Sequence, residues 1–405
     1  MSRVREQYEA LPYPARDPAD ERKRLITGSP GALAEVEHYL FGGRIDRTRP
    51  FRALSAGGGT GDGTIMLAQQ MADARLAGEV VYLDLSTASR RIVEARAKLR
   101  GLTNLSFHTG SLLDLAAMGL GAFDYIDCCG VLHHLPDPPA GLRALVAALR
   151  PGGGLGLMVY GTYGRSGVYE MQDLLHQLVG DAPIPEQIAL ARRLLKTLPP
   201  TNRLARNPFV RDHVEGGDAG LYDLLLHSQD RSYTVPELVD LLASAGVAPA
   251  AFVEPAAYEP STYLTDPKLL PRFERLPWPE RCAAAERLAG SLKVHVVYAA
   301  PGDARGRVAD PDDPMAIPVP VGLDTAAVAA TAARGQGVSV TLNGVKLPLA
   351  LPRFAPALLT RMDGRRPLAD ICADLGRPWE ELRADWLKTF RLLNGVSKLM
   401  VRRGE

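Results

Sequence analysis

The residues of this chain whose types and spacing could do chemistry begin with a glycine-rich loop. Gly57, Gly59 and Gly61 are spaced G-x-G-x-G directly after an apolar run. Glycine has no β-carbon, so such a loop can turn sharply and bring backbone N–H groups close to a ligand. Asp84 ends the next apolar run, where a carboxylate can accept hydrogen bonds from both hydroxyls of a ribose. Together they indicate a nucleoside-containing ligand, and the G-x-G-x-x-G dinucleotide fingerprint does not occur here in any register.

Both features also have a structural interpretation. A glycine-rich turn before a helix is common in proteins without a ligand at that place. Asp84 could serve as the N-cap of a helix over Thr87–Leu99, and the capping and ribose roles can be shared.

A histidine pair is the second candidate for chemistry. His133 and His134 are the only adjacent pair among eight histidines, and they follow the fourth apolar run of the alternating pattern. Ligands bind at the carboxyl edge of open α/β sheets, so a histidine there could deprotonate an incoming nitrogen, oxygen or sulfur nucleophile. The alternative is that one histidine packs against the ligand or caps the next helix.

The elements that must position these residues are strands that alternate with helices. The first five predicted strands are Phe51–Ala56, Val80–Leu83, Leu105–His108, Tyr125–Cys129 and Leu155–Tyr160. Alternation of this kind implies βαβ units and a parallel sheet. Two further apolar runs, Ala250–Val253 and Leu292–Tyr298, bring the number of predicted strands to seven.

The fifth strand is followed by an insertion, 161–232, that loses the strand rhythm. Helical patterns over Val168–Val179 and Ile188–Leu198 and a loop over Pro199–Gly220 predict a helical cap above a binding cleft. The polar run that starts at His227 lines the pocket or forms a solvated loop. Thr234 and Glu237 then form a capping box at the start of the next helix.

The two ends of the chain have different compositions. Residues 1–50 predict an N-terminal helical lid segment, with Tyr13 as an aromatic wall, before the domain over 51–300. Five prolines and four aspartates predict a linker over 301–320. The Asn343-Gly344 turn, three helical patterns and a terminal strand predict a small winged-helix-like α+β domain over 321–405. Its mixed charges disfavour DNA binding and favour protein or peptide docking, or a homodimer.

Bulk properties exclude several classes of function. A net charge of +1 gives no steering toward nucleic acid or anionic lipid, and no 18 consecutive apolar residues occur. Four cysteines without C-x-x-C spacing indicate reduced thiols in a cytoplasmic protein, and Cys128 and Cys129 are expected to be buried. Only Asp127 and Asp137 lie near the end of the fourth strand, so no metal is expected.

The motifs together resemble those of the class I methyltransferases that use S-adenosylmethionine (SAM). The shared elements, in order, are G-x-G-x-G, the D-L-S that begins at Asp84, the F-D at Phe123, G-V-L-H-H-L and L-R-P-G-G. The segment Tyr8–Pro14 also resembles an N-terminal signature in one branch of that family. The resemblance implies a Rossmann-like, seven-stranded, mostly parallel sheet whose last strand is antiparallel. It also implies SAM as cofactor and methyl transfer to a small molecule or to a protein or peptide.

The resemblance assigns roles to individual residues. The expected cofactor-binding residues are Tyr13, Ser55, Gly57, Gly59, Gly61, Asp84, Leu85, Ser111, Leu112 and Gly130, and the catalytic candidates are His133 and His134. Two positions depart from the family pattern. Ser55 stands where an acid is usual, and Ser111 stands where an aspartate often accepts from the adenine amino group. The alternative function is a non-catalytic SAM-binding scaffold whose C-terminal module recruits a protein or DNA partner.

Overall fold

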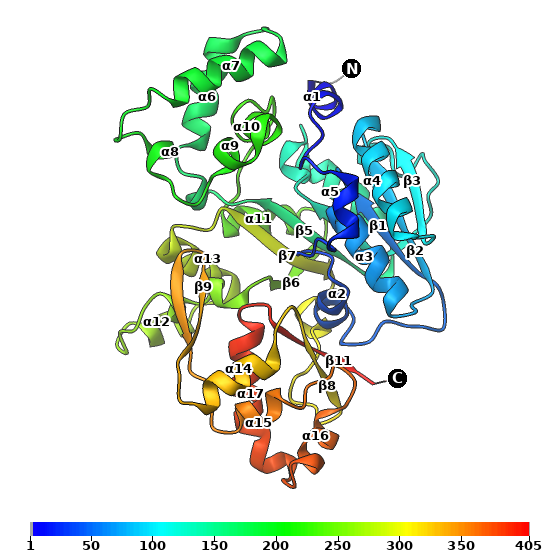
Figure 1. Cartoon of the computed structure of the whole chain (residues 1–405), viewed down its shortest axis with the longest axis vertical. Helices are drawn as coiled ribbons and strands as arrows, with labels where there is room; N and C mark the ends of the chain where they lie inside the picture. The colour runs from blue at the N-terminus through cyan, green and yellow to red at the C-terminus, as the bar shows by residue number, and fades with distance from the viewer. Residues whose placement is uncertain (1–2, 405) are drawn as a thin grey trace.

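A computed structural model describes residues 3–404, and within them strands β1–β7 form one seven-stranded sheet (Figure 1). The strands are β1 (Phe51–Ala56), β2 (Gly78–Asp84), β3 (Leu105–Thr109), β4 (Phe123–Cys129), β5 (Leu149–Tyr160), β6 (Val247–Phe252) and β7 (Val294–Pro301). Their order is β3-β2-β1-β4-β5-β7-β6, and β7 runs antiparallel to both of its neighbours. The predicted Rossmann-like sheet with an antiparallel last strand is confirmed.

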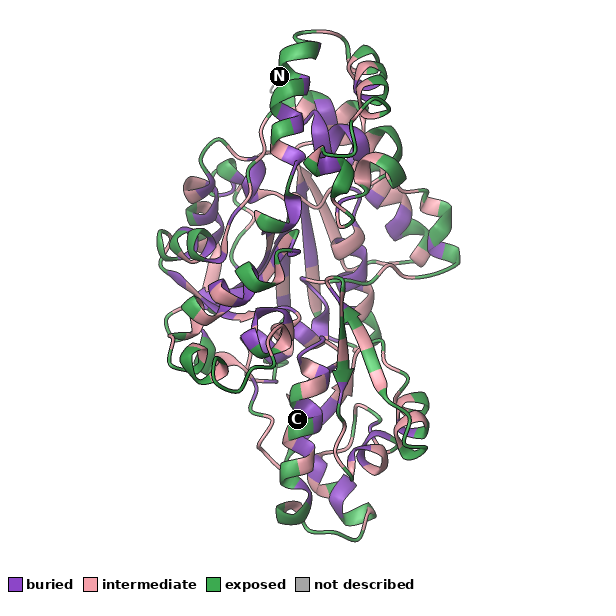
Figure 2. Cartoon of the chain, turned by 90° about the vertical axis from the view of Figure 1, so that its left-hand side faces the viewer, coloured by how far each residue is buried: buried purple, intermediate pink, exposed green. Residues whose placement is uncertain are grey.

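Helices cover both faces of this sheet because its strands are apolar on both sides. One face packs against α5 (Pro138–Ala147), α11 (Val235–Ala243) and α13 (Trp278–Ala289). The other packs against α2 (Leu33–Leu40), α3 (Asp62–Asp73) and α4 (Thr87–Arg100). Neighbouring residues of one strand therefore enter different cores, Leu54 the first and Ala53 the second. Figure 2 shows the buried strands running through the centre of the molecule.

The inserted cap forms its own helical layer beyond the carboxyl edge of the sheet (Figure 1). It contains η4 (Tyr163–Arg165), α6 (Val168–Val179), α7 (Ile184–Leu195), α8 (Arg203–Arg206), α9 (Asp212–Glu215) and α10 (Gly217–Leu225). The first predicted helix is confirmed, whereas the predicted loop over Pro199–Gly220 holds two short helices and the start of α10. Asn202 initiates α8 by accepting hydrogen bonds from the backbone N–H groups of Leu204 and Ala205. The predicted capping box of Thr234 and Glu237 is present at the start of α11.

Short helices occupy the remaining connections of the sheet domain. They are α1 (Arg3–Ala10), η1 (Pro18–Arg22), η2 (Leu112–Asp114), η3 (Leu132–His134), η5 (Pro255–Tyr258), η6 (Pro260–Thr262), α12 (Leu270–Glu274) and η7 (Arg305–Arg307). None of the helices within residues 3–404 has the length and apolar character needed to cross a membrane.

The C-terminal unit contains the predicted hairpin and helices but joins its strands differently. Its elements are β8 (Ala316–Pro320), α14 (Thr325–Ala333), β9 (Val338–Leu342), β10 (Val345–Leu349), α15 (Ala355–Leu359), α16 (Leu368–Asp374), α17 (Trp379–Asn394) and β11 (Leu399–Arg403). Asn343-Gly344 closes the β9–β10 hairpin as predicted. Strand β11 pairs with β8 and not with the hairpin, so the winged-helix interpretation is not confirmed.

The segment 301–320 is therefore not an extended linker along its whole length. Its last five residues form β8, whose Ala316 and Ile317 are buried. Earlier in the segment, Arg307 donates hydrogen bonds to the carbonyls of Gly152 and Gly153. The proline and aspartate content predicted a linker, although the segment ends in an apolar run, β8, that pairs with β11.

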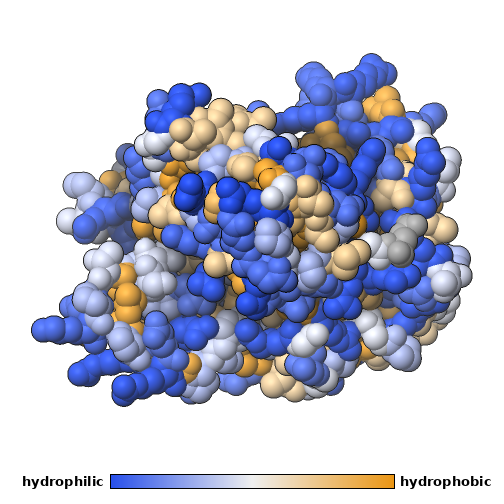
Figure 3. Space-filling model, turned by 90° about the horizontal axis from the view of Figure 1, so that it is seen from below, coloured by the Kyte–Doolittle hydropathy of each residue, from blue (hydrophilic) through white to orange (hydrophobic). Residues whose placement is uncertain are grey.

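The C-terminal unit also packs directly on α2. His38 Nδ1 lies 3.1 Å from the Val401 carbonyl, and the Arg403 N–H donates to the Gly43 carbonyl at 2.7 Å. Met400 is fully buried in the core that contains α2. These contacts replace the independent motion that a flexible linker would allow. Seen from below (Figure 3), this end of the molecule is mainly hydrophilic, with apolar side chains in scattered patches.

Candidate functional site

A cavity of about 320 Å³ lies at the carboxyl ends of β1, β2 and β4, and we call it the sheet-edge cavity. All ten residues predicted to bind the cofactor line it: Tyr13, Ser55, Gly57, Gly59, Gly61, Asp84, Leu85, Ser111, Leu112 and Gly130. His134 lines it as well, but His133 does not. The fold therefore gathers at one place residues that are separated by more than 100 positions in sequence.

The glycine loop has a conformation that other residues would strain. Gly57, Gly59 and Gly61 have φ angles of +72°, +51° and +97°. A β-carbon at Gly59 would lie 2.9 Å from the Tyr13 carbonyl oxygen, and one at Gly57 would lie 2.4 Å from Val131 Cγ2. The loop therefore packs too closely against Val131, which follows β4, and against the N-terminal segment to accept a side chain at these positions.

Asp84 is held at the tip of β2 by backbone N–H groups. Its Oδ2 accepts from the Gly59 N–H at 2.8 Å and its Oδ1 accepts from the Ser86 N–H at 2.8 Å. The N-cap of α4 is Ser86, whose Oγ accepts from the Ser89 N–H, so the alternative capping role of Asp84 is not observed. Burial raises the pKa of Asp84, while the N–H groups act in the opposite direction. Each carboxylate oxygen keeps a lone pair for ribose hydroxyls.

The two serines that depart from the family pattern are already engaged. Ser55 Oγ lies 2.8 Å from Thr64 Oγ1, a hydrogen bond that joins β1 to α3. Ser111 Oγ accepts from the Leu113 N–H and caps η2. Both hydroxyls retain a lone pair for the cavity, but neither supplies a charge.

The N-terminal segment covers the sheet-edge cavity and is fixed to α4. The Glu9 carboxylate accepts from the N–H groups of Thr87 and Ala88 at 2.6 and 3.1 Å, at the positive end of that helix. Thr60 Oγ1 donates to the Pro14 carbonyl at 2.7 Å. Tyr8, Tyr13 and the segment 26–30 then form the wall of the cavity that faces the glycine loop.

The cap supplies a buried carboxylate that the sequence analysis missed. Asp223 on α10 accepts from the hydroxyls of Tyr8 and Tyr160 at 3.0 and 3.1 Å, and all three residues line the cavity. Burial raises the pKa of Asp223 to about 6. Its sequence context, Leu221-Tyr-Asp-Leu-Leu225, resembles that of any amphipathic helix and gave no signal.

Two histidines face each other beside this carboxylate. The rings of His134 and His227 stack with centroids 3.8 Å apart. The Gln229 carbonyl accepts from His134 Nδ1–H at 2.9 Å, whereas the Gln229 N–H donates to His227 Nδ1 at 3.1 Å. One backbone residue thus fixes opposite tautomers: His134 keeps a lone pair on Nε2, and His227 carries its proton on Nε2, which lies 3.3 Å from the Tyr8 hydroxyl.

Burial keeps His134 in its neutral form. The pKa of His134 is lowered mainly by burial, although the nearby Asp230 carboxylate opposes the shift. His227 is also buried, but Ser228 and Arg231 of its segment are exposed and no residue of 227–233 lines the cavity, so neither interpretation describes the whole segment. His133 lies behind His134, with its ring 3.9 Å from that of Tyr160, and neither ring nitrogen has a hydrogen-bond partner in the described chain.

The same residues bear on the prediction that no metal is bound. His134, Asp223 and His227 place one potential ligand atom each within 4.8 Å of the others. However, the hydrogen bond from Gln229 occupies the lone pair of neutral His227, and both Asp223 oxygens accept from tyrosines. The trio forms a hydrogen-bond network, and the absence of a metal requirement stays a prediction.

Strand β4 contributes two further side chains that differ from expectation. Cys128 is buried as predicted, but Cys129 is exposed and lines the cavity, because alternate residues of a strand face opposite sides and β4 ends there. Asp127 also lines the cavity, next to Ser55 in the parallel register of β1 and β4. The available signal for Asp127 was an acid near the end of a mainly apolar strand, although that strand also contains Asp124.

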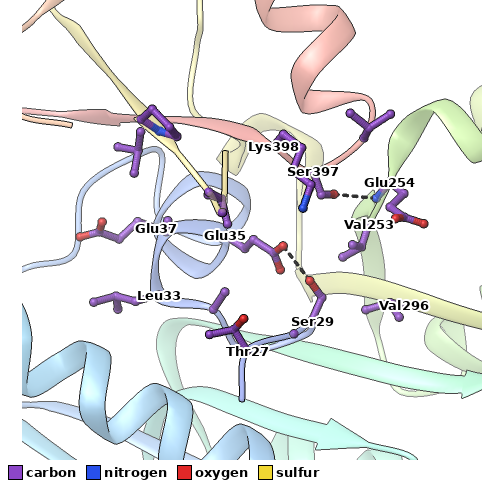
Figure 4. A pocket seen from close by; sticks show the side chains of 18 of the residues that line it. Thr27, Ser29, Leu33, Glu35, Glu37, Val253, Glu254, Val296, Ser397 and Lys398 are labelled. Atoms are coloured by element: carbon purple, nitrogen blue, oxygen red, sulfur yellow. Dashed lines mark hydrogen bonds between the residues drawn. The ribbon is translucent and has the colours of Figure 1, made fainter. Parts of the chain in front are cut away.

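A second cavity, of about 980 Å³, lies between α2, β7 and the C-terminal unit, and we call it the interdomain cavity (Figure 4). Glu35, Ser29 and Lys398 converge on it. The Glu35 carboxylate accepts from Ser29 Oγ at 2.7 Å and from the Tyr298 hydroxyl at 2.8 Å. Residues 27–29 line both cavities and form a shared wall.

Comparison with known proteins agrees with this geometry. Residues 54–155 match the family profile described as a methyltransferase domain. An uncharacterised protein of Synechococcus sp. is 30% identical over 279 residues, which cover 66% of this chain and 64% of that protein. A ubiquinone biosynthesis O-methyltransferase of Xanthomonas oryzae pv. oryzae is 37% identical over 127 residues, 31% of this chain and 48% of that enzyme.

A solved structure shares the fold over most of the chain. PKMT2 from Rickettsia typhi superposes with a TM-score of 0.60 at 14% identity, covering 92% of this chain and 76% of that one. The chain spans less than two thirds of the length of the curated relatives named above.

Proposed function

We infer that this chain, which belongs to the class I SAM-dependent methyltransferases, transfers a methyl group from SAM to a nitrogen, oxygen or sulfur nucleophile. The acceptor is a small molecule or a protein or peptide side chain. The observation that carries the proposal is the sheet-edge cavity, which is lined by the glycine loop, by Asp84, by the neutral His134 of η3 and by Asp223 of the cap.

The residues present fit SAM. β-Carbons at the loop glycines would clash with neighbouring protein atoms, so glycine allows the tight turn whose N–H groups, with the start of α3, suit the methionine carboxylate. Asp84 accepts from the ribose hydroxyls, and Ser111 and Leu112 lie where adenine would pack. Tyr13 closes the cavity from the N-terminal segment.

Bound SAM supplies an electrophilic methyl group on a sulfonium centre. The contribution of this chain is to exclude water and to align the acceptor for in-line attack. Asp223, Tyr8 and Tyr160 form a fixed polar wall that orients the acceptor. His134 lines the cavity and keeps a lone pair on Nε2, so it takes the proton of the attacking nucleophile as general base.

The C-terminal unit is proposed to select or position the acceptor without supplying catalytic groups. No histidine occurs in 321–405, and its only cysteine, Cys372, is buried. The unit packs on α2 and lines the interdomain cavity. Residues 27–29 separate this cavity from the sheet-edge cavity and line both.

Labelled SAM incubated with the protein and a cell lysate tests the proposal. Label should pass to the small-molecule or the protein fraction, and S-adenosylhomocysteine should bind in calorimetry. The matched control is Gly59→Val, whose side chain would clash with the Tyr13 carbonyl and strain the loop at a positive φ, so it should abolish both signals. Binding without label transfer to any fraction would favour the non-catalytic scaffold.

A further inference from the structure

The position at which the family usually carries an acid is neutral in this chain. Ser55 stands there, two residues before the first glycine of the loop, and its hydroxyl is hydrogen-bonded to Thr64. A cationic group of a ligand at this end of the sheet-edge cavity would therefore meet no charge from β1.

The neighbouring strand places a carboxylate at the same level. Asp127 on β4 is the parallel register partner of Ser55, so the two side chains leave the sheet on the same face. Asp127 is 5% exposed, and it lines the cavity. Its Oδ1 has no hydrogen-bond partner among the described residues.

The space around this carboxylate is kept open by glycines. A β-carbon on Gly63 would lie 2.7 Å from Asp127 Oδ2, and one on Gly31 would lie 3.3 Å from the same atom. Gly63 is in the first turn of α3, and Gly31 directly follows the segment 26–30 that forms a wall of the cavity. The carboxylate therefore sits where the glycine loop, α3 and the N-terminal segment meet.

A second buried aspartate on β4, Asp124, differs from Asp127 in having cationic partners. Asp124 is 2% exposed and pairs with the guanidinium groups of Arg49 and Arg150 at 2.6 and 2.7 Å. No lysine or arginine in residues 3–404 forms such a pair with Asp127. Burial without a cation raises the pKa of Asp127 to about 8. A buried carboxylate in this state gains most from a cation delivered by a ligand.

We propose that Asp127 is the acceptor for the α-ammonium group of SAM, and that it replaces from β4 the charge that Ser55 lacks on β1. The assignment rests on the proposed function, because it concerns how this site holds its methyl donor. It makes Asp127 a cofactor-binding residue that the G-x-G-x-G motif does not reveal.

The test pairs one substitution with two ligands that differ in one group. Calorimetry measures binding of S-adenosylhomocysteine and of its deaminated analogue, which keeps the carboxylate but lacks the α-ammonium group. Asp127→Asn should weaken S-adenosylhomocysteine by roughly 10- to 100-fold, as expected for a hydrogen bond to a charged group. Affinity for the deaminated analogue should stay within about twofold. The control Asp114→Asn removes an exposed carboxylate outside the cavity and should change neither affinity.

A charge relocation provides the second arm. Ser55→Asp in the Asp127→Asn background should recover at least tenfold of the lost affinity, because the two positions are register partners. The ligand-free Asp127→Asn protein should unfold at a temperature no lower than that of the wild type, since no ion pair is broken.

The outcomes separate the two proposals. Wild-type protein that binds neither ligand would remove the proposed function together with this assignment. Wild-type binding of S-adenosylhomocysteine with equal affinity in Asp127→Asn would overturn the assignment alone. Equal losses for both ligands would also overturn it, because the effect would then not depend on the ammonium group.

Discussion

The sheet-edge cavity and the interdomain cavity differ in how their residues are arranged along the chain. Most of the first is lined by residues between 55 and 160, and several belong to recognisable motifs. The second collects residues from the N-terminal segment, α2, β7, β8 and β11, and the one sequence signal among its lining residues is Asn343 of the hairpin turn, which indicates a fold and no chemistry. Motifs therefore located the chemistry, but they gave no information on the larger cavity beside it.

The shared wall gives this comparison a functional meaning. Ser29 faces both cavities and donates to Glu35, which belongs to the interdomain side. If the two regions act separately, changes on the sheet-edge side should alter binding and turnover strongly. Changes on the interdomain side should then affect them weakly.

The largest effect is expected at His134. His134→Gln should lower turnover about 100-fold or more, because a positioned general base is lost, while affinity for S-adenosylhomocysteine stays unchanged. Burial lowers the pKa of His134, so wild-type turnover should decline only at a pH below that at which an ordinary histidine becomes protonated. His176→Gln, on an exposed face of α6, is the control. Unchanged turnover in His134→Gln would show that His134 is not a general base and that catalysis depends on alignment of the acceptor with the methyl group.

A smaller effect is expected at Asp84. Asp84→Ala should weaken binding of S-adenosylhomocysteine by about 1–3 kcal/mol, because two hydrogen bonds to the ribose are lost. Calorimetry measures the change, and Asp73→Ala at the exposed end of α3 serves as the control. Equal affinity of Asp84→Ala and wild type would exclude Asp84 from the ribose site.

The interdomain side should respond less. Glu35→Gln keeps an acceptor for Ser29 but removes the charge that Tyr298 and Ser29 stabilise, so affinity for S-adenosylhomocysteine should change by no more than about 1 kcal/mol. Burial raises the pKa of Glu35, so the folded wild type holds the protonated carboxyl more tightly than the unfolded chain does. The unfolding temperature of wild type relative to Glu35→Gln should therefore be highest at acidic pH and should fall as pH rises through the pKa of Glu35 in the folded protein. A loss of binding as large as that of Asp84→Ala would show that the shared wall couples the cavities strongly.

The smallest effect is expected from metal removal. Both oxygens of Asp223 and the Nδ1 atoms of His134 and His227 are already hydrogen-bonded, so excess chelator should leave turnover unchanged. Turnover that requires an added divalent cation would refute this. It would also point to a ligand group such as His133, His134 and Asp230, whose potential ligand atoms lie within 4.8 Å of one another.

Sequence alone determined the features that depend on a few consecutive residues. The glycine loop, the Thr234 capping box and the Asn343-Gly344 turn each follow from local backbone preferences. The seven strands followed from alternating apolar runs, and their antiparallel last member followed from the family resemblance. The ends of elements were less accurate: β7 begins at Val294 where Leu292 was predicted, because tertiary pairing sets where a strand starts.

Tertiary structure decided which distant residues meet. Asp127 lies beside Ser55 only because β1 and β4 pair in parallel register. Asp223 accepts hydrogen bonds from Tyr8 and Tyr160 only because the cap folds over the sheet edge. The pairing of β8 with β11 turned part of a proline-rich segment into a strand. Local sequence encodes backbone conformation, whereas burial, pKa and hydrogen-bond partners depend on contacts between segments that only the folded chain brings together.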